Sequence, residues 1–230
     1  MTVDAPKWAL KRAAAVRAAE EVRSGMVVGL GSGSTAELAV EELGRRVESG
    51  LAIVGVPSSE RTRALAEKFR IPLAPSNDWP RIDLTIDGAD QVERGTLSLI
   101  KGLGGALLRE KIVASASARM IVAVDGSKIV DRLGGATPLP VEIVPFGTPR
   151  TLDRLTALGL GPKLRQAAGK PFVTDGGNHI ADCAIPRIDD AKRLEAELSA
   201  IVGVVETGLF LGLASMVVVG RDSGIEVMKR

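Results

Sequence analysis

The stretch DLTIDGADQVERGTLSLIKGLGGALLREK, residues 83–111, decides how this chain is interpreted. It contains two short apolar runs that are typical of strands, and a glycine-rich turn that opens a helix. Charged side chains follow these elements: Asp87 and Asp90 after the first run, Lys101 after the second, and Glu110 within the helix. Because open α/β sheets hold their ligands at the carboxyl ends of the strands, we expect these side chains to converge. Carboxylates and a cation in one place indicate proton-transfer chemistry on a small anionic molecule.

Each of these residues also has a simpler interpretation. Asp-Gly is a frequent turn signal, so Asp87 can cap the turn of a β-hairpin between 81–86 and 96–100. Asp90 would repel Asp87 unless a cation or a ligand offset the repulsion, and a Mg²⁺ site is a competing functional interpretation of the pair. Glu110 stands between two basic residues, a pattern that also fits a solvent-exposed helix face.

Similar strand-to-helix junctions precede this stretch. MVVGL at 26–30 is followed by GSGST at 31–35 and a helix at 36–47, and LAIVGV at 51–56 is followed by PSSERT at 57–62. Glycines and hydroxyls before a helix suit a phosphate, although hydroxyls also cap helices, and such loops also bind dinucleotides or S-adenosylmethionine. The repeated strand–helix order predicts an α/β fold with a doubly wound, mostly parallel sheet.

Glycine and proline cluster in LGGATPLP, residues 133–140, and the predicted elements after this segment are shorter and of mixed type. Strands interleaved with two helices follow, which predicts a small α+β module of ferredoxin-like type. We therefore expect a Rossmann-like catalytic domain formed by residues 1–132 and 207–230, and a small domain formed by residues 133–206. The shorter elements expected along the chain are strands at 71–73, 141–144, 172–173, 179–185 and 202–206 and helices at 6–24, 106–117, 150–158 and 189–200.

Composition excludes several classes of function. Among 230 residues, 30 basic and 28 acidic side chains give a net charge of +2, and only 3% of residues are aromatic, so neither nucleic acid nor an anionic membrane surface is an expected partner. One cysteine, Cys183, and one histidine, His179, make a zinc site of the usual Cys/His kind improbable. The most apolar segment, 208–220, is too short to span a membrane. With no apolar signal-peptide core in the first residues, we expect a cytoplasmic protein.

Eight motifs, in order, make the chain resemble the ribose-5-phosphate isomerase type A family. They are GSGSTA at 31–36, PSSERT at 57–62, DGAD at 87–90, KGLGGALLREK at 101–111, DGSK at 125–128, PLPVEIVPFG at 138–147, VTDGGN at 173–178 and GVVETGLF at 203–210. The resemblance implies an enzyme that interconverts ribose 5-phosphate and ribulose 5-phosphate, in the non-oxidative pentose phosphate pathway, without a metal or cofactor. It also implies a homodimer or homotetramer.

The resemblance assigns roles residue by residue. It implies that Glu110 is the general base, that Asp87 and Asp90 are active-site carboxylates, and that Lys101 acts with them in catalysis. The residues implied to bind substrate lie in four motifs: Ser32, Gly33, Ser34, Thr35, Gly88, Ala89, Gly102, Leu103, Gly104 and Lys128. Three positions depart from the usual family pattern: Gln91 follows DGAD where a glutamate is usual, Leu103 interrupts the glycine run, and Ser32 stands where threonine is common.

These residues can carry an isomerisation. We expect Glu110 to move a proton between C1 and C2 through a cis-enediolate, while Lys101 stabilises the developing oxyanion. Asp87 or Asp90 would move the hydroxyl protons, and the loop 32–35 would hold the phosphate. A non-catalytic sugar-phosphate sensor would not need Glu110 and Lys101 together. A nucleotide or S-adenosylmethionine enzyme would favour an acid after the strand 51–56, where this chain has Pro57.

Overall fold

The computed structural model describes residues 5–76, 78, 79 and 81–230. It is a mixed α/β fold whose main sheet has the strand order β16-β15-β6-β3-β1-β2. All neighbouring strands are parallel except the edge pair of β15 and β16. The strands are β1 Val27–Leu30, β2 Val54–Pro57, β3 Leu84–Asp87, β6 Met120–Asp125, β15 Ala214–Arg221 and β16 Gly224–Lys229. The predicted α/β fold with a mostly parallel main sheet is thus confirmed.

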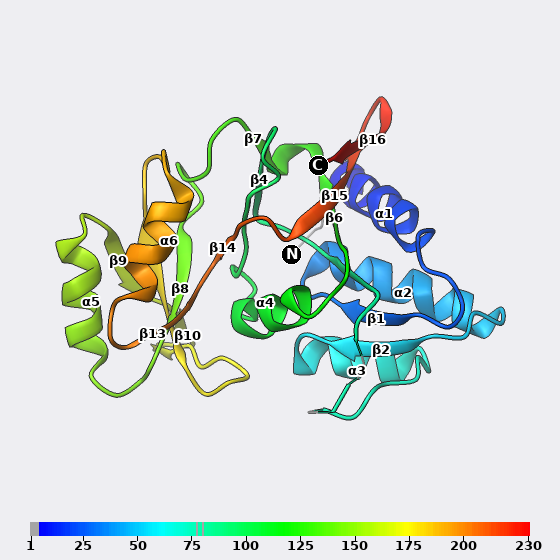
Figure 1. The fold of residues 1–230 in the computed structure, drawn as a ribbon, viewed down its shortest axis with the longest axis horizontal. Helices are drawn as coiled ribbons and strands as arrows, with labels where there is room; N and C mark the ends of the chain where they lie inside the picture. The colour runs from blue at the N-terminus through cyan, green and yellow to red at the C-terminus, as the bar shows by residue number, and fades with distance from the viewer. Residues whose placement is uncertain (1–4, 77, 80) are drawn as a thin grey trace.

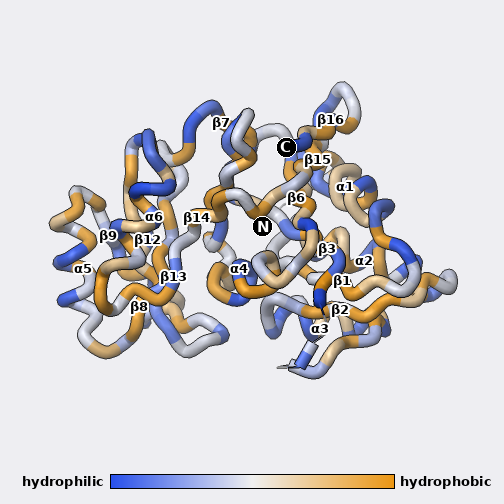
Figure 2. Tube along the Cα trace, viewed as in Figure 1, coloured by the Kyte–Doolittle hydropathy of each residue, from blue (hydrophilic) through white to orange (hydrophobic). Residues whose placement is uncertain are grey.

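The central strands are apolar because both faces of the main sheet are covered. Along β6, Ile121 and Ala123 pack into the core formed with α1 Ala5–Ala19, α2 Ser34–Glu48 and α3 Glu60–Lys68. The alternate side chains Met120, Val122 and Val124 pack into a second core on the other face. Figure 2 shows hydrophobic residues along β2, the edge strand of the main sheet. No helix among the described residues is long and apolar enough to cross a membrane.

The second face is covered by a small sheet of order β14-β5-β4-β7 and by α4 Leu107–Ser115. Its strands are β4 Gln91–Glu93, β5 Leu99–Ile100, β7 Ile129–Val130 and β14 Leu209–Phe210. The prediction of a hairpin between 81–86 and 96–100 is wrong, because these two segments do not pair with each other. Both edges of β3 are already occupied by β1 and β6, so the returning strand β5 pairs instead with β4.

The segment from β8 to β13, here called the small module, has the ferredoxin-like order β8-α5-β9-β12-α6-β13. Its four strands pair antiparallel in the order β13-β8-β12-β9, and Cys183 lies fully buried in its core. The elements are β8 Leu139–Ile143, α5 Thr148–Ala157, β9 Gly161–Leu164, β12 His179–Ala184, α6 Ala191–Ser199 and β13 Val204–Thr207. In Figure 1 the module lies to one side of the main sheet, α4 lies between them, and β14 leads back to β15. The exact division into domains stays a prediction.

The two short strands expected at 71–73 and 172–173 do not form. Residues 172–173 directly follow a hairpin of β10 Gln166–Ala167 and β11 Lys170–Pro171, so the strand of this segment ends just before the expected one. Residues 71–73 contribute only a single bridge, between Leu73 and Gly55. The N-terminal helix ends at Ala19, before the expected residue 24.

The order of the strands determines where a ligand can bind. From β1 the chain moves outward to β2, then returns past β1 to β3, so the direction of winding reverses between β1 and β3. Leu30 is aligned with Ile86 in this pair, and the loops that follow, 31–33 and 88–90, therefore lie side by side. Open α/β sheets bind ligands in the crevice at such a reversal.

Candidate active site

The centre of the site is an ammonium group held between two carboxylates. Lys101 Nζ lies 3.0 Å from Asp87 Oδ2 and 3.3 Å from Glu110 Oε2. It also donates a hydrogen bond of 2.8 Å to the carbonyl of Gly88. All three charged side chains are at most 4% exposed. Because a buried charge is costly unless it is paired, these groups must be treated as one unit.

The ends of two strands hold Asp87 in place. Its Oδ1 accepts hydrogen bonds from the backbone amides of Ser32, at 3.1 Å, and Gly88, at 2.7 Å. The backbone of the β1 loop approaches so closely that a Cβ atom at Gly31 would lie 2.3 Å from the Asp87 carboxyl. A glycine is required there, and the approach packs the loop 31–35 against the carboxylate of the neighbouring strand.

The environments of the two carboxylates differ, and this separates their roles. Burial raises the pKa of Glu110 to about 8, with the positive charge of Lys101 opposing the rise and the charge of Asp87 adding to it. Burial also raises the pKa of Asp87, but Lys101 and the amides of Gly88 and Ser32 oppose it. Asp87 Oδ1 accepts two backbone hydrogen bonds, whereas Glu110 Oε2, like Asp87 Oδ2, has no hydrogen-bond partner among the described residues. Glu110 is therefore the carboxylate best suited to exchange a proton near neutral pH.

Lys101 remains an ammonium group in this setting. Burial lowers its pKa, but the negative charges of Asp87 and Glu110 more than compensate, so the net pKa lies above its ordinary value. A buried ammonium with three hydrogens can hold Asp87 and the Gly88 carbonyl and still stabilise a negative oxygen in the adjacent cavity.

A cavity opens beside this unit at the carboxyl ends of β1 and β3. Its lining includes two groups of charged side chains: Asp90, Lys101 and Glu110, which lie close to one another, and Lys11 with its neighbour Lys128. The remaining lining residues are Ser32, Gly33, Ser34, Thr35, Gly88, Ala89, Gly102 and Gly104. The cavity lining thus contains all the site residues expected from the sequence except Asp87 and Leu103.

Those two exceptions have definite positions. Asp87 lies behind Lys101, 1% exposed, and does not line the cavity. Leu103 is 41% exposed and does not line the cavity, while its backbone amide donates a 2.9 Å hydrogen bond to Asp90 Oδ2. Leu103 is thus placed to orient Asp90 through its backbone.

Lys11 on α1 is a cavity residue that the sequence did not reveal. Its Nζ donates a 3.0 Å hydrogen bond to Ser34 Oγ, at the first residue of α2. Burial lowers the pKa of Lys11, and the charge of Asp125 opposes that change. With Lys128 and the amides that open α2, Lys11 makes this end of the cavity a site for an anion. On a helix rich in Lys and Arg, nothing in the sequence distinguishes Lys11 from its neighbours.

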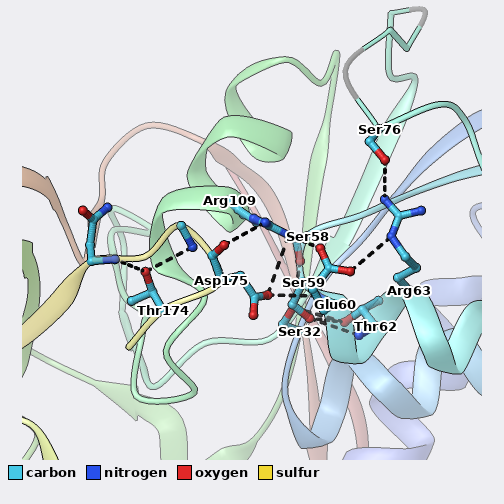
Figure 3. A network of polar contacts seen from close by, with 12 residues as sticks. Ser32, Ser58, Ser59, Glu60, Thr62, Arg63, Ser76, Arg109, Thr174 and Asp175 are labelled. Carbon is cyan, nitrogen blue, oxygen red and sulfur yellow. Dashed lines mark hydrogen bonds and ion pairs between the residues drawn. The ribbon is translucent and has the colours of Figure 1, made fainter. Parts of the chain in front are cut away.

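Hydroxyl groups support the loop from behind (Figure 3). Ser32 Oγ lies within hydrogen-bonding distance of Ser58, at 2.9 Å, Ser59, at 2.8 Å, and Thr62, at 3.1 Å. Thr62 Oγ1 also donates to the carbonyl of Gly31, at 3.0 Å. The two hydroxyl-rich junctions at 31–35 and 57–62 therefore meet, and the hydroxyls of the second junction hold the loop without lining the cavity.

The helix that carries Glu110 is tied to the small module on both sides. Arg109 donates to the backbone carbonyl of Asp175, at 3.0 Å, and to Glu60, at 2.6 Å (Figure 3). Lys111 Nζ lies 2.7 Å from Glu206 Oε1 of β13, and its side chain is 13% exposed. The basic neighbours of Glu110 are therefore partners of other elements, and the solvent-exposed interpretation of this helix face does not hold for Glu110.

Comparisons with known proteins agree with this geometry. Residues 54–224 match the family model of ribose 5-phosphate isomerase A (phosphoriboisomerase A). The chain belongs to the ribose 5-phosphate isomerase A family. A ribose-5-phosphate isomerase A of Gloeobacter violaceus is 54% identical over 219 residues, which cover 95% of each chain. The resemblance found in the sequence is thereby confirmed.

Two solved structures extend the agreement to three dimensions. Ribose 5-phosphate isomerase A of Methanocaldococcus jannaschii has a TM-score of 0.92 and 40% identity, and the match covers 96% of this chain and 99% of that one. A D-ribose-5-phosphate isomerase solved in complex with phospho-erythronic acid also has a TM-score of 0.92, with 38% identity over 96% of this chain and 98% of that one. The ribose 5-phosphate isomerase A fold thus covers nearly the whole chain.

Of the departures from the family pattern, Ser32 lines the cavity, whereas Gln91 and Leu103 do not. Gln91 exchanges two hydrogen bonds with the backbone of Gly134, one of 2.7 Å from its amide nitrogen and one of 2.8 Å to its amide oxygen. The Gln91 side chain is therefore held by the backbone of Gly134, and its amide group satisfies both the carbonyl and the N–H of that residue.

Among the described residues, no group of three or more His, Cys, Asp or Glu side chains is placed to hold a metal ion.

Proposed function

We propose that this chain is an aldose–ketose isomerase that interconverts D-ribose 5-phosphate and D-ribulose 5-phosphate in the pentose phosphate pathway. The observation that carries the proposal is a buried Glu110 with a pKa of about 8 beside the Lys101 ammonium, in one cavity with an anion site. A proton acceptor, an oxyanion stabiliser and a phosphate anchor are the three components that this reaction needs.

The phosphate end determines how the sugar lies. The hydroxyls and amides of residues 32–35, with Lys11 and Lys128, would bind the 5-phosphate, so that C1 and C2 of the open-chain sugar extend toward Glu110. The ligand in the complex of the related isomerase, phospho-erythronic acid, is also a small molecule that bears a phosphate.

The chemical step takes place at C1 and C2 of the sugar, beside Glu110 and Lys101. Ionised Glu110 takes the proton from C2 of the aldose, and the electron pair of that C–H bond forms the C1–C2 double bond while the carbonyl electrons move to O1. Lys101 stabilises the negative oxygen of the resulting cis-enediolate. Protonated Glu110 then returns the proton to C1 as the O2 electrons form the new carbonyl. Asp90 faces the cavity and would move the hydroxyl proton between O2 and O1, whereas Asp87 acts from behind by holding Lys101.

A direct assay tests the proposal. Purified protein is mixed with ribose 5-phosphate, and formation of ribulose 5-phosphate is followed, with ribose lacking the phosphate as the comparison substrate. We expect turnover only of the phosphorylated sugar. Binding of ribose 5-phosphate without formation of the ketose would instead identify a sugar-phosphate sensor.

We further propose a cytoplasmic, metal-independent enzyme that forms a homodimer or homotetramer. In support of self-association, Phe146 is 94% exposed and Val202 is 78% exposed, and the backbone of Val144 bonds to that of Gly203, which brings these segments together on the small module. In support of a reducing compartment, the single cysteine, Cys183, is buried and free. Light scattering coupled to size-exclusion chromatography measures the mass of the assembly directly.

A further inference from the structure

An arginine of the small module reaches the catalytic loop from outside the cavity. Arg165 follows β9, and its Nη1 donates hydrogen bonds of 3.0 Å to the carbonyls of both Gly102 and Leu103. These are the two residues directly after Lys101. The side chain is only 13% exposed, so the contact is shielded from solvent.

The guanidinium group is itself held rigidly. Asp182 of β12 binds Nε, at 2.9 Å, and Nη2, in the two-pronged geometry that fixes an arginine in one plane. The ring of Phe172 lies 5.8 Å from the guanidinium carbon. Phe172 also packs against Gly105, where an added Cβ would lie 2.5 Å from the ring. The small module therefore contacts both ends of the loop 102–105.

The loop has few internal restraints of its own. Gly102 and Gly105 have φ values of +106° and +87°, and one backbone hydrogen bond of 3.0 Å joins Gly105 to Gly102. The peptides of the turn carry functional contacts, since Gly102 and Gly104 line the cavity and the Leu103 amide binds Asp90. A glycine-rich turn is flexible unless other groups determine its conformation.

We propose that Arg165 is a positioning residue for the isomerase reaction. It fixes the two carbonyls of the loop from the small module, while Asp90 fixes the Leu103 amide from the cavity. The Leu103 peptide is thus held from both sides, and with it the orientation of Asp90 and the start of the helix that carries Glu110. The small module is in this way a part of the catalytic apparatus, although Arg165 touches no substrate. The inference rests on the proposed function.

The test compares four variants and one control variant at a temperature where each is folded. Arg165→Ala removes the clamp. Arg165→Lys keeps the charge but lacks the planar fork that binds Asp182 through two nitrogens while a third contacts the two carbonyls. Asp182→Ala is made alone and together with Arg165→Ala. Arg193→Ala, which removes the exposed ion pair with Glu197 on the same module, is the matched control. The values measured are kcat, KM and the hydrogen-exchange rate of the Leu103 and Gly105 amides.

We expect Arg165→Ala to lower kcat by about 10- to 100-fold, because a displacement of about 1 Å at a catalytic group has an effect of that size. The exchange rates of the two amides should rise at least about tenfold, Arg165→Lys should lie between Arg165→Ala and the unmodified protein, and Asp182→Ala should add nothing to Arg165→Ala. The control should change kcat less than about twofold. A purely structural role would lower the unfolding temperature and leave kcat of the folded protein unchanged.

The proposal is overturned if Arg165→Ala retains kcat within about twofold and unchanged amide exchange. Should Arg165→Ala fail to fold, the same outcome in Arg165→Lys overturns it. Absence of isomerase activity in the unmodified protein would refute the proposed function instead, and the exchange rates would still decide whether Arg165 restrains the loop.

Discussion

Replacing Glu110 with Gln should abolish turnover and at the same time stabilise the fold. Burial raises the pKa of Glu110 from 4.5 to about 8, so at pH 7 folding must protonate a side chain that is ionised in the unfolded chain. Each pH unit above the ordinary pKa costs about 1.4 kcal/mol, which gives about 3 kcal/mol at pH 7 and about 5 kcal/mol above pH 8. Glutamine resembles the protonated acid in shape and avoids this cost.

The sign of the pH dependence follows from the raised pKa. The favourable contribution of protonated Glu110 is fully present below the unfolded pKa of 4.5 and is lost as the pH rises through the folded value of about 8. We therefore expect the two proteins to have similar stability near pH 4.5. The Gln variant should become progressively more stable up to about pH 8, and the difference should then level off.

Thermal unfolding and steady-state kinetics measure both effects. For a chain of this size, about 3 kcal/mol corresponds to a rise in Tm of about 6 to 12 °C at pH 7. The loss of the general base should lower kcat by about 10² to 10⁴-fold with little change in KM. Glu67→Gln, at an exposed position of α3, is the control and should change neither quantity. A Gln variant with near-normal kcat would refute the assignment of the base, and a Tm difference that is constant with pH would refute the raised pKa.

Three further predictions concern the surroundings of Glu110. Lys101→Met should lower the free energy of unfolding, measured by urea titration, by about 3 to 5 kcal/mol, because Asp87 loses its buried partner. The loss should be larger at pH 8 than at pH 5. An equal loss for Lys68→Met, at an exposed position, would contradict this. Lys11→Ala should raise KM for ribose 5-phosphate about tenfold with kcat within about twofold, since a bond to a charged phosphate is lost; Lys7→Ala on the same helix is its control. Treatment with EDTA should leave activity unchanged, whereas a loss that Mg²⁺ restores would favour the metal interpretation of the Asp pair.

The parts of the site that follow strand ends could be predicted from the sequence. The loops at 31–35 and 87–90 each follow an apolar run, and parallel strands bring such ends to one edge of a sheet. The ferredoxin-like module was also readable, because its strands and helices alternate in a recognisable order. Both inferences need only local patterns and a rule of topology.

The remaining features depend on partners that are distant in the sequence. Glu110 lies between two basic residues and resembles surface, but Lys101 and the small module enclose it. The hairpin expected after Asp87 was wrong because β1 and β6 occupy both edges of β3. Lys11 could not be chosen among the cations of its helix, since only the packing of α1 against α2 brings it to Ser34.

The position of the small module in the chain has a consequence for folding. Met120 of β6 pairs with Ala214 of β15, while every strand of the module lies between them in the sequence. During synthesis the module can complete its own strand pairs before β15 has left the ribosome. Throughout that interval β6, which is apolar from Met120 to Val124, has an unpaired edge, and such an edge is the kind of surface on which chains aggregate. Any chain that stops before residue 214 would keep that edge open permanently.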